Sequence, residues 1–438
     1  MTHQAPTGPS LCLDALRITL SRVGSRRWYI STLQLQLTSL EVCALCRDVC
    51  RLRLSVKLGA PRSLWENAAT SDGEIKKLDN ARVPTLRPQI VLWNLPFSHF
   101  GQFSSEVLAN VKELRFDDAF NGTVDEAALP LSLQEFNFKL SLNQPTDGIT
   151  WPASLCLLIL GGNFNQPIDK VAWPASLHTL KFCDNFNQPV VGVAWPTSLY
   201  ILCFLGTFNQ PINGVAWPTS LRKLAFGYHF DQPIDAVSWP GSLRVLHFWR
   251  NFYQPMGGVS WPKLLKRLIL GCALNQPIHT VVWPASLETL TLEGEFNRLI
   301  DKVAWPASLK QLALGESFNQ PIERATWPAS LQVLNLGWSF NQPLDGVVWP
   351  ASLQQLRFGG LFNQPIDGVA WPASLKQLTF GGYKFNQPID GVVWPASLQQ
   401  LTLGSYFFQP MERVVWPASL QRITIGEENH GTVRPPGM

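Results

Sequence analysis

Charged residues and long apolar runs are both scarce in this chain. Only 15% of its 438 residues are charged and the net charge is +4, a balance too mild to indicate nucleic-acid binding by itself. No stretch of about 18 consecutive apolar residues occurs, so we expect no membrane-spanning helix. Residues 1–6 lack the basic start of a secretory signal, and Asp14 and Arg17 interrupt the apolar stretch that follows. No such signal is predicted.

A catalytic arrangement is also missing. His178, His229, His247 and His279 fall at unrelated positions, and none has a Ser or Cys partner that the sequence places beside it. Catalysis needs a nucleophile, a base and an orienting group that converge on one site. The sequence therefore predicts a protein that is not an enzyme.

A Trp-Pro pair dominates what is present. It recurs thirteen times, 22 residues apart each time except between Trp371 and Trp394, where the spacing is 23. A fixed period of this length is typical of a solenoid, in which each repeat packs only on its neighbours. The tryptophans are Trp151, Trp173, Trp195, Trp217, Trp239, Trp261, Trp283, Trp305, Trp327, Trp349, Trp371, Trp394 and Trp416.

One repeat indicates how the chain folds back on itself. Leu177, Leu180 and Phe182 follow an L-x-x-L-x-L pattern whose end alternates with a period of two, as a short strand does. Pro174 and Pro189 exclude a regular helix from the return path. We predict a mainly β, leucine-rich-repeat-like solenoid with a concave parallel sheet and an extended or 3₁₀ convex side.

A second column of the repeat is the Asn that follows a Phe in most copies. Its amide suits a turn whose backbone groups no strand can reach, so we predict an asparagine ladder. Asp231, Tyr253 and Phe408 interrupt the column, and those repeats are expected to need another solution. Its members are Asn121, Asn143, Asn165, Asn187, Asn209, Asn275, Asn297, Asn319, Asn341, Asn363 and Asn386.

These residues carry a family resemblance. The L-x-x-L-x-L stretch resembles a leucine-rich repeat, and Phe-Asn-Gln-Pro-Ile at 362–366 with Trp-Pro-Ala-Ser-Leu at 371–375 resembles the FNIP repeat. The resemblance covers roughly residues 110–426. It implies a curved protein-interaction scaffold and offers no catalytic residues to carry over. Where this family commonly has Leu-Pro the chain has Trp-Pro, although residues 129–133 keep the Leu form.

The sequence predicts three parts. Residues 1–88 do not follow the period, and residues 89–426 are expected to form a solenoid of about 14–15 repeats. Leu92 lies 22 residues before Leu114, so residues 89–110 are a candidate first repeat. Residues 427–438 form a polar tail.

The N-terminal part leaves several interpretations open. Residues 33–58 look helical or mixed, and Val49-Cys50-Arg51 faintly resembles the end of an F-box, a module that FNIP-repeat proteins can carry. The opening Leu-Pro of an F-box is absent, and Arg53 stands where an aromatic residue is expected. A diverged cap and a misassigned start of the gene are the alternatives.

The cysteines bear on metal binding and on redox compartment. Cys43, Cys46 and Cys50 have a spacing that could begin a metal site, but the same spacing lies on one face of a helix beside Leu40 and Leu54. No fourth Cys or His is nearby, so we favour the helix face and expect no metal or other cofactor. The four later cysteines occupy different repeat positions, which argues against a disulfide ladder and favours a reducing, cytoplasmic location.

Recognition would be encoded where the repeats differ. The variable positions of the strands carry cations and an aromatic residue in the middle repeats, and neutral glutamines in the later repeats. Nothing in the sequence indicates that folding requires like charges at these positions. We call this set the basic patch, and its interpretations are a docking site for an acidic protein partner or drift on a solvated surface. It consists of Arg222, Lys223, Arg244, His247, Trp249, Arg250, Lys266 and Arg267.

The predicted function is therefore a non-enzymatic protein-interaction scaffold that binds its partner on the concave face. An F-box-type substrate receptor of a ubiquitin ligase is one alternative. A surface or adhesive protein, for which Asn121-Gly122-Thr123 offers a glycosylation acceptor, is another. No nucleic-acid or membrane partner is expected, and the oligomeric state is left open.

Overall fold

Strands, turns and extended segments make up all of the chain that the structure describes. In this computed structural model the chain divides into two compact units, residues 1–186 with 194–199, and residues 187–193 with 200–438. The described residues are 54–57, 90–93, 111–115, 129–138, 143–271, 273–426 and 432–433.

The first unit contains short parallel strands that pair repeat by repeat. Leu92 of β2 aligns with Leu114 of β3, and the register of this pair shifts between Ile90 and Val91. Strand β1 pairs in parallel with β2, so the end of the segment predicted to be helical or mixed is a strand. The strands are β1 (Leu54–Lys57), β2 (Ile90–Trp93), β3 (Val111–Arg115), β4 (Glu135–Asn137), β5 (Leu157–Leu160) and β6 (Thr179–Phe182).

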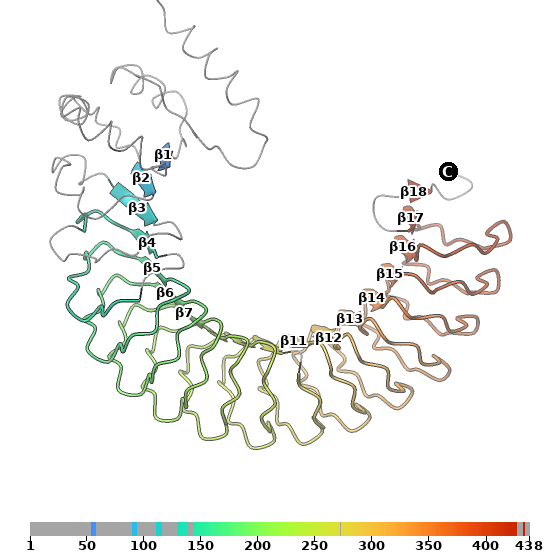
Figure 1. Ribbon diagram of the computed structural model, residues 1–438. Helices are drawn as coiled ribbons and strands as arrows, with labels where there is room; N and C mark the ends of the chain where they lie inside the picture. Colours follow the sequence, from blue (N-terminus) through green and yellow to red (C-terminus); the bar gives the residue numbers. More distant parts are fainter. Residues whose placement is uncertain are drawn as a thin grey trace, which may run out of the picture. The chain divides into compact units, whose positions relative to one another are not determined.

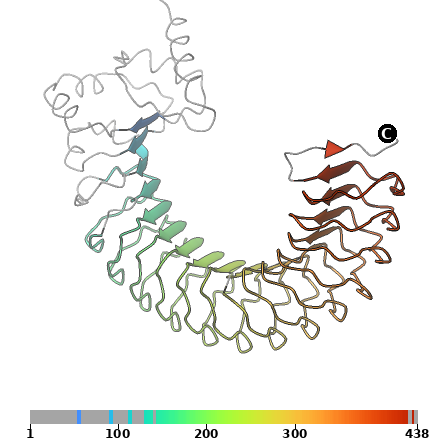
Figure 2. The same cartoon turned by 45° about the vertical axis from the view of Figure 1, so that its right-hand side comes forward.

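The second unit contains the longer run of parallel strands. Within it β7 to β17 each pair in parallel with the next, and β18 pairs antiparallel with β17. Figures 1 and 2 show these strands side by side on the inner side of a curved stack, with the turns projecting outwards. The predicted concave parallel sheet is therefore confirmed for this unit.

The strands of the second unit are three or four residues long, apart from the two-residue β18. Their bounds are β7 (Ile201–Phe204), β8 (Lys223–Phe226), β9 (Val245–Phe248), β10 (Arg267–Leu270), β11 (Thr289–Leu292), β12 (Gln311–Ala313), β13 (Val333–Asn335), β14 (Gln355–Phe358), β15 (Gln377–Phe380), β16 (Gln400–Leu403), β17 (Arg422–Ile425) and β18 (Thr432–Val433).

The core is a stack of identical side chains from successive repeats. In β9 the alternate residues Leu246 and Phe248 are fully buried, as the period of two predicts. Trp283 lies between Trp261 and Trp305, with ring centroids 6.4 Å away on both sides and interplanar angles of 17° and 15°. Each large side chain is thus enclosed by its neighbours' copies, which a single repeat could not do.

The segment that returns the chain from the end of one strand to the start of the next consists of turns in the described residues, not of a 3₁₀ helix. In one repeat the N–H of Leu265 donates to the carbonyl of Pro262 at 3.1 Å, that of Leu274 to Gly271 at 3.2 Å, and that of Val281 to Ile278 at 3.2 Å. Each of these bonds spans three residues and closes a β-turn. In this repeat three turns bring the chain back towards the next strand.

The asparagine ladder is present, and the atom that joins one repeat to the next is the side-chain oxygen, which accepts a hydrogen bond. Oδ1 of Asn187 accepts the backbone N–H of Asn209 at 2.9 Å, one repeat later. Asp231 continues the ladder, because its carboxylate accepts the N–H of Tyr253 at 2.8 Å. The expectation that Asp231 needs another solution is therefore wrong, since the position requires an acceptor and a carboxylate supplies one.

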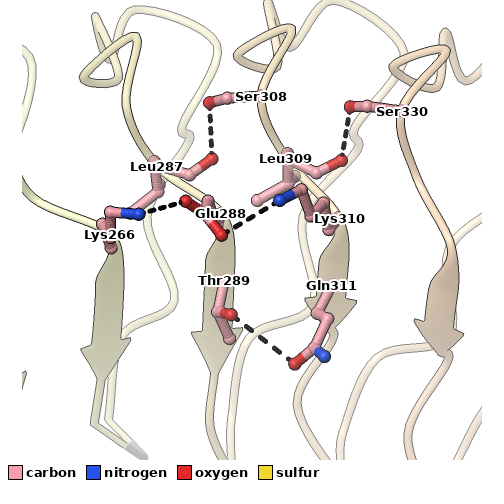
Figure 3. Close-up of polar contacts among 9 residues, drawn as sticks. All are labelled: Lys266, Leu287, Glu288, Thr289, Ser308, Leu309, Lys310, Gln311 and Ser330. Carbon is pink, nitrogen blue, oxygen red and sulfur yellow. Dashed lines mark hydrogen bonds and ion pairs between the residues drawn. The ribbon is translucent and has the colours of Figure 1, made fainter.

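A serine ladder, which the sequence analysis did not identify, runs beside it. In Trp-Pro-x-Ser-Leu the hydroxyl donates to the Leu carbonyl of the previous repeat, as Ser286 does to Leu265 at 2.8 Å. Figure 3 shows the next two of these bonds, from Ser308 to Leu287 and from Ser330 to Leu309. Each satisfies a backbone carbonyl and contributes about 0.5–1.5 kcal/mol.

The repeat with one extra residue keeps its register, as expected. Phe385 stacks on Phe362 at 6.0 Å, and the N–H of Asn386 donates to Asn363 at 2.9 Å. The added length is taken up in the turn after β15, where Tyr383 and Lys384 are exposed. The core columns stay aligned because the insertion leaves the stack.

Candidate functional site

The basic patch lies on the solvent-facing side of β8, β9 and β10. In each strand the second and fourth residues enter the core, and the first and third lie on the other side of the sheet, where the small side chain of Ala225 is buried. Lys223 and Arg267 are exposed, and Val245 and His247 are half-buried. Strand pairing aligns Lys223, Val245 and Arg267 in one line across three strands. Two cations therefore flank an apolar side chain on this face.

A second line of cations lies just before the strands. The N–H of Arg244 donates to the carbonyl of Arg222 at 2.9 Å, and that of Lys266 to the carbonyl of Arg244 at 2.9 Å. These bonds stack the three residues in successive repeats, as the sequence pattern predicts. Arg222 and Lys266 are exposed, whereas Arg244 is half-buried.

Two of these three charges have partners within the fold, so the view that folding offers no reason for them is wrong. The guanidinium carbon of Arg222 lies 5.0 Å from the centre of the Tyr200 ring, a cation–π contact. Nζ of Lys266 lies 2.7 Å from a carboxylate oxygen of Glu288, which also holds Lys310 at 3.2 Å. Figure 3 shows Glu288 between its two lysines. Their hydrogen bonds lower the pKa of Glu288.

Trp249 occupies a different environment from the exposed one that the sequence suggested. It lies in the turn after β9, half-buried between two aromatic rings, with its indole N–H buried and without a hydrogen-bond partner. The His247 ring stacks on it at 5.1 Å, and Tyr228 meets it edge-on at 4.8 Å. Trp249 thus supports the edge of the patch, and the exposed aromatic is Tyr228.

His247 is held in its neutral form. Burial, followed by the charges of Lys223 and Arg267, lowers its pKa to about 4. Its Nε2 is buried and has no hydrogen-bond partner. The cations that lower this pKa are the same two that flank Val245, so the protonation of the imidazole depends on the positive charge of the patch.

Three exposed cations of the patch have no carboxylate partner in the described part of the chain. They are Lys223 and Arg267 on the sheet and Arg250 in the turn after β9. Farther along, the first outward position of the strands holds a neutral Gln, as at Gln355 and Gln377. Exposed cations such as Arg357 and Arg422 also occur on later strands, but β8 and β10 carry theirs at aligned positions on either side of Val245.

Other chemistry is not apparent in the described residues. Within these ranges no group of three or more His, Cys, Asp or Glu side chains could hold a metal ion. No helix in them is long and apolar enough to span a membrane. The cysteine cluster at 43–50, the F-box-like segment and Asn121 lie outside the described residues, so the hypotheses attached to them remain predictions.

Comparison with family models identifies the repeat. The FNIP repeat model matches residues 142–185, 208–251, 296–339, 318–361, 340–383, 362–393 and 385–428, which together cover just over half of the chain. The chain belongs to the FNIP repeat family. None of the curated proteins is similar enough in sequence to count as a relative. The F-box hypothesis gains no support from this match, which is confined to the repeats.

Solved structures place the FNIP repeats among leucine-rich-repeat folds. CroV588, described as a novel circular LRR protein, is 30% identical over 77% of this chain and 58% of its own, with a TM-score of 0.50. The Drosophila Toll–Spatzle complex matches with a TM-score of 0.54 at 13% identity, over 79% of this chain and 56% of that one. The chain thus spans just over half the length of these proteins.

Proposed function

We propose that this FNIP-repeat protein is a non-enzymatic scaffold that binds an acidic segment of a partner protein on the concave, solvent-facing side of β8, β9 and β10. The observation that carries the proposal is the cluster of Lys223, Arg250 and Arg267, three exposed cations that no described carboxylate neutralises. Arg222 and Lys266 are already engaged within the fold, so they contribute less to a partner.

Charge and shape both suit a protein segment at this face. Lys223 and Arg267 lie on either side of half-buried Val245, which offers an apolar contact between two cationic ones. Complementary charge of this kind speeds association and fixes register, and salt weakens it. Toll, a protein of similar fold, is solved in complex with Spatzle, which is consistent with a protein ligand for such a solenoid.

The experiment compares two double variants in pull-downs at low and high salt. Lys223→Gln with Arg267→Gln removes both unpaired cations of the sheet. Lys302→Gln with Arg324→Gln removes two exposed cations from turns outside the patch and matches the charge change. The first variant loses two exposed charge contacts with the partner, each worth about 0.5–1 kcal/mol, so its binding should be roughly tenfold weaker. The second variant should bind as the wild type does. Equal capture of the same partners by both variants would refute the proposal.

We further propose that the protein works in the cytoplasm. Cys156, Cys183 and Cys203 form no disulfide in the described structure, as suits a reducing compartment. Fractionation of cells that express the tagged chain, followed by electrophoresis without reductant, tests this location. Recovery in a secreted or surface fraction would contradict it.

A further inference from the structure

Four exposed aromatic side chains form a continuous row at one edge of the second unit. Trp338, Tyr383, Tyr406 and Phe408 are 45%, 46%, 54% and 74% exposed. Successive ring centroids lie 5.9, 6.1 and 6.2 Å apart, each pair meeting edge-to-face. They lie in the turns that follow β13, β15 and β16. We call these four residues the aromatic strip.

Glycines in the backbone beside these rings leave room for the row. A Cβ at Gly360 would come within 2.5 Å of the Trp338 indole, so only glycine lets that ring lie across the next repeat. Gly382 has a φ of +80°, and a Cβ there would meet the Cα of Gly360 at 2.4 Å. Glycine at both positions therefore leaves room for the Trp338 ring to reach Tyr383 across the intervening repeat.

Folding does not require aromatic residues at these turns. Glu316 holds the same position as Trp338 one repeat earlier and is exposed. The serine after each residue, Ser317 or Ser339, donates its N–H to a carbonyl of the previous repeat at 2.8 Å. The edge-to-face contacts stabilise these pairs only modestly, and about half or more of each side chain remains exposed to water. Contiguous exposed apolar patches of this kind mark interaction sites.

Polar groups beside the strip indicate the chemistry of a ligand. Nε of Arg357 lies 3.9 Å from the Cβ position of Gly381, and Lys384 follows Tyr383 directly. In the described part of the chain neither cation pairs with a carboxylate. The indole N–H of Trp338 and the hydroxyl of Tyr406 likewise have no hydrogen-bond partner among the described residues.

We propose that the aromatic strip binds an extended, proline-rich peptide segment that carries acidic residues. Perpendicular rings about 6 Å apart leave notches that accept proline rings, the mode by which aromatic grooves take preformed polyproline II segments. The free donors on Trp338 and Tyr406 suit the solvated carbonyls of such a segment, and Arg357 and Lys384 suit its carboxylates. A single-stranded nucleic acid fits less well, because two cations neutralise few phosphates.

Fluorescence anisotropy of labelled peptides on the full chain tests this proposal. The probe is a peptide of four Pro-Pro-Asp triplets. The comparison probes are four Gly-Gly-Asp triplets, four Pro-Pro-Lys triplets and a ten-nucleotide oligo-dT. We expect the Pro-Pro-Asp probe to bind at least about tenfold more tightly than each of the others, a difference of about 1.4 kcal/mol. Equal binding of any comparison probe would overturn the proposal, and preferred binding of oligo-dT would identify a nucleic-acid surface instead.

Three variants locate the binding. Trp338→Ser with Tyr383→Ser should weaken binding of the Pro-Pro-Asp probe about tenfold or more, because both rings of one edge-to-face pair are lost. Tyr253→Ser removes an exposed aromatic outside the strip and should change nothing. Lys384→Glu keeps every ring and should shift preference towards the Pro-Pro-Lys probe, a readout that loss of folding cannot mimic. An unchanged preference in Lys384→Glu, or equal losses in the two Ser variants, would refute the assignment.

Discussion

Replacing Asn341 separates the hydrogen-bonding role of the ladder from simple packing. Its Oδ1 accepts the N–H of Asn363 at 2.8 Å and Nε2 of Gln364 at 3.2 Å. Asn341→Leu leaves the N–H of Asn363 without its acceptor, which costs about 1–3 kcal/mol, and removes a side-chain bond worth about 0.5–1.5 kcal/mol. We expect a loss of roughly 2–4 kcal/mol in the free energy of unfolding.

Asn341→Asp is the matched control, because Asp231 already fills this column elsewhere and accepts the same two bonds at 2.8 and 3.0 Å. Near neutral pH this variant should stay within about 1 kcal/mol of the wild type, since the acceptor is retained. Urea unfolding followed by circular dichroism measures both variants. The reasoning fails if Asp costs as much as Leu, or if Leu costs less than about 0.5 kcal/mol.

Three other predictions concern packing and charge. Trp283→Ala should cost about 3–5 kcal/mol in urea unfolding, and Trp416→Ala less, because Trp283 is enclosed on both sides whereas Trp416 is half-buried; equal losses would contradict this. Because the pKa of His247 is lowered to about 4, protonation favours unfolding, so stability should fall between about pH 6.5 and 4. Thermal unfolding of His247→Gln at several pH values should show a smaller loss of stability between about pH 6.5 and 4 than the wild type does. The same pH dependence in both proteins would count against a neutral His247. Glu288→Gln should leave the midpoint of thermal unfolding near pH 7 almost unchanged, as expected for an exposed ion pair, and a clear drop in that midpoint would show that the ion pairs of Glu288 stabilise the sheet.

Much of the fold follows from the sequence because a repeat makes every residue a neighbour of its own copies. Trp283 must meet Trp261 and Trp305 once the period is known, and the same argument stacks the Asn column. The alternation of Leu246 and Phe248 fixes which face of β9 is buried. Even the repeat with an extra residue was predictable, because Phe385 and Asn386 could keep their columns only if the insertion left the stack.

The remainder depended on geometry that the period does not encode. The serine ladder was missed because nothing in Trp-Pro-x-Ser-Leu shows that the hydroxyl faces the previous repeat's carbonyl. Glu288 could have been found, since it occupies the column of Lys266 and Lys310 in the intervening repeat. The burial of Trp249 depends on the conformation of a turn of variable sequence. Sequence therefore located the basic patch but not which of its charges are free.

The most direct test of the account is where a partner touches the protein. A photocrosslinking amino acid at Val245, between Lys223 and Arg267, should capture an acidic segment of a partner in cell extract, and the capture should decrease as salt rises. The same group at Ala304, exposed on the turns outside the patch, should not. Mass spectrometry of the crosslinked peptides reads out both positions. Crosslinks at Ala304 but not at Val245, or crosslinks at Val245 that salt does not reduce, would contradict a charged binding face on β8, β9 and β10.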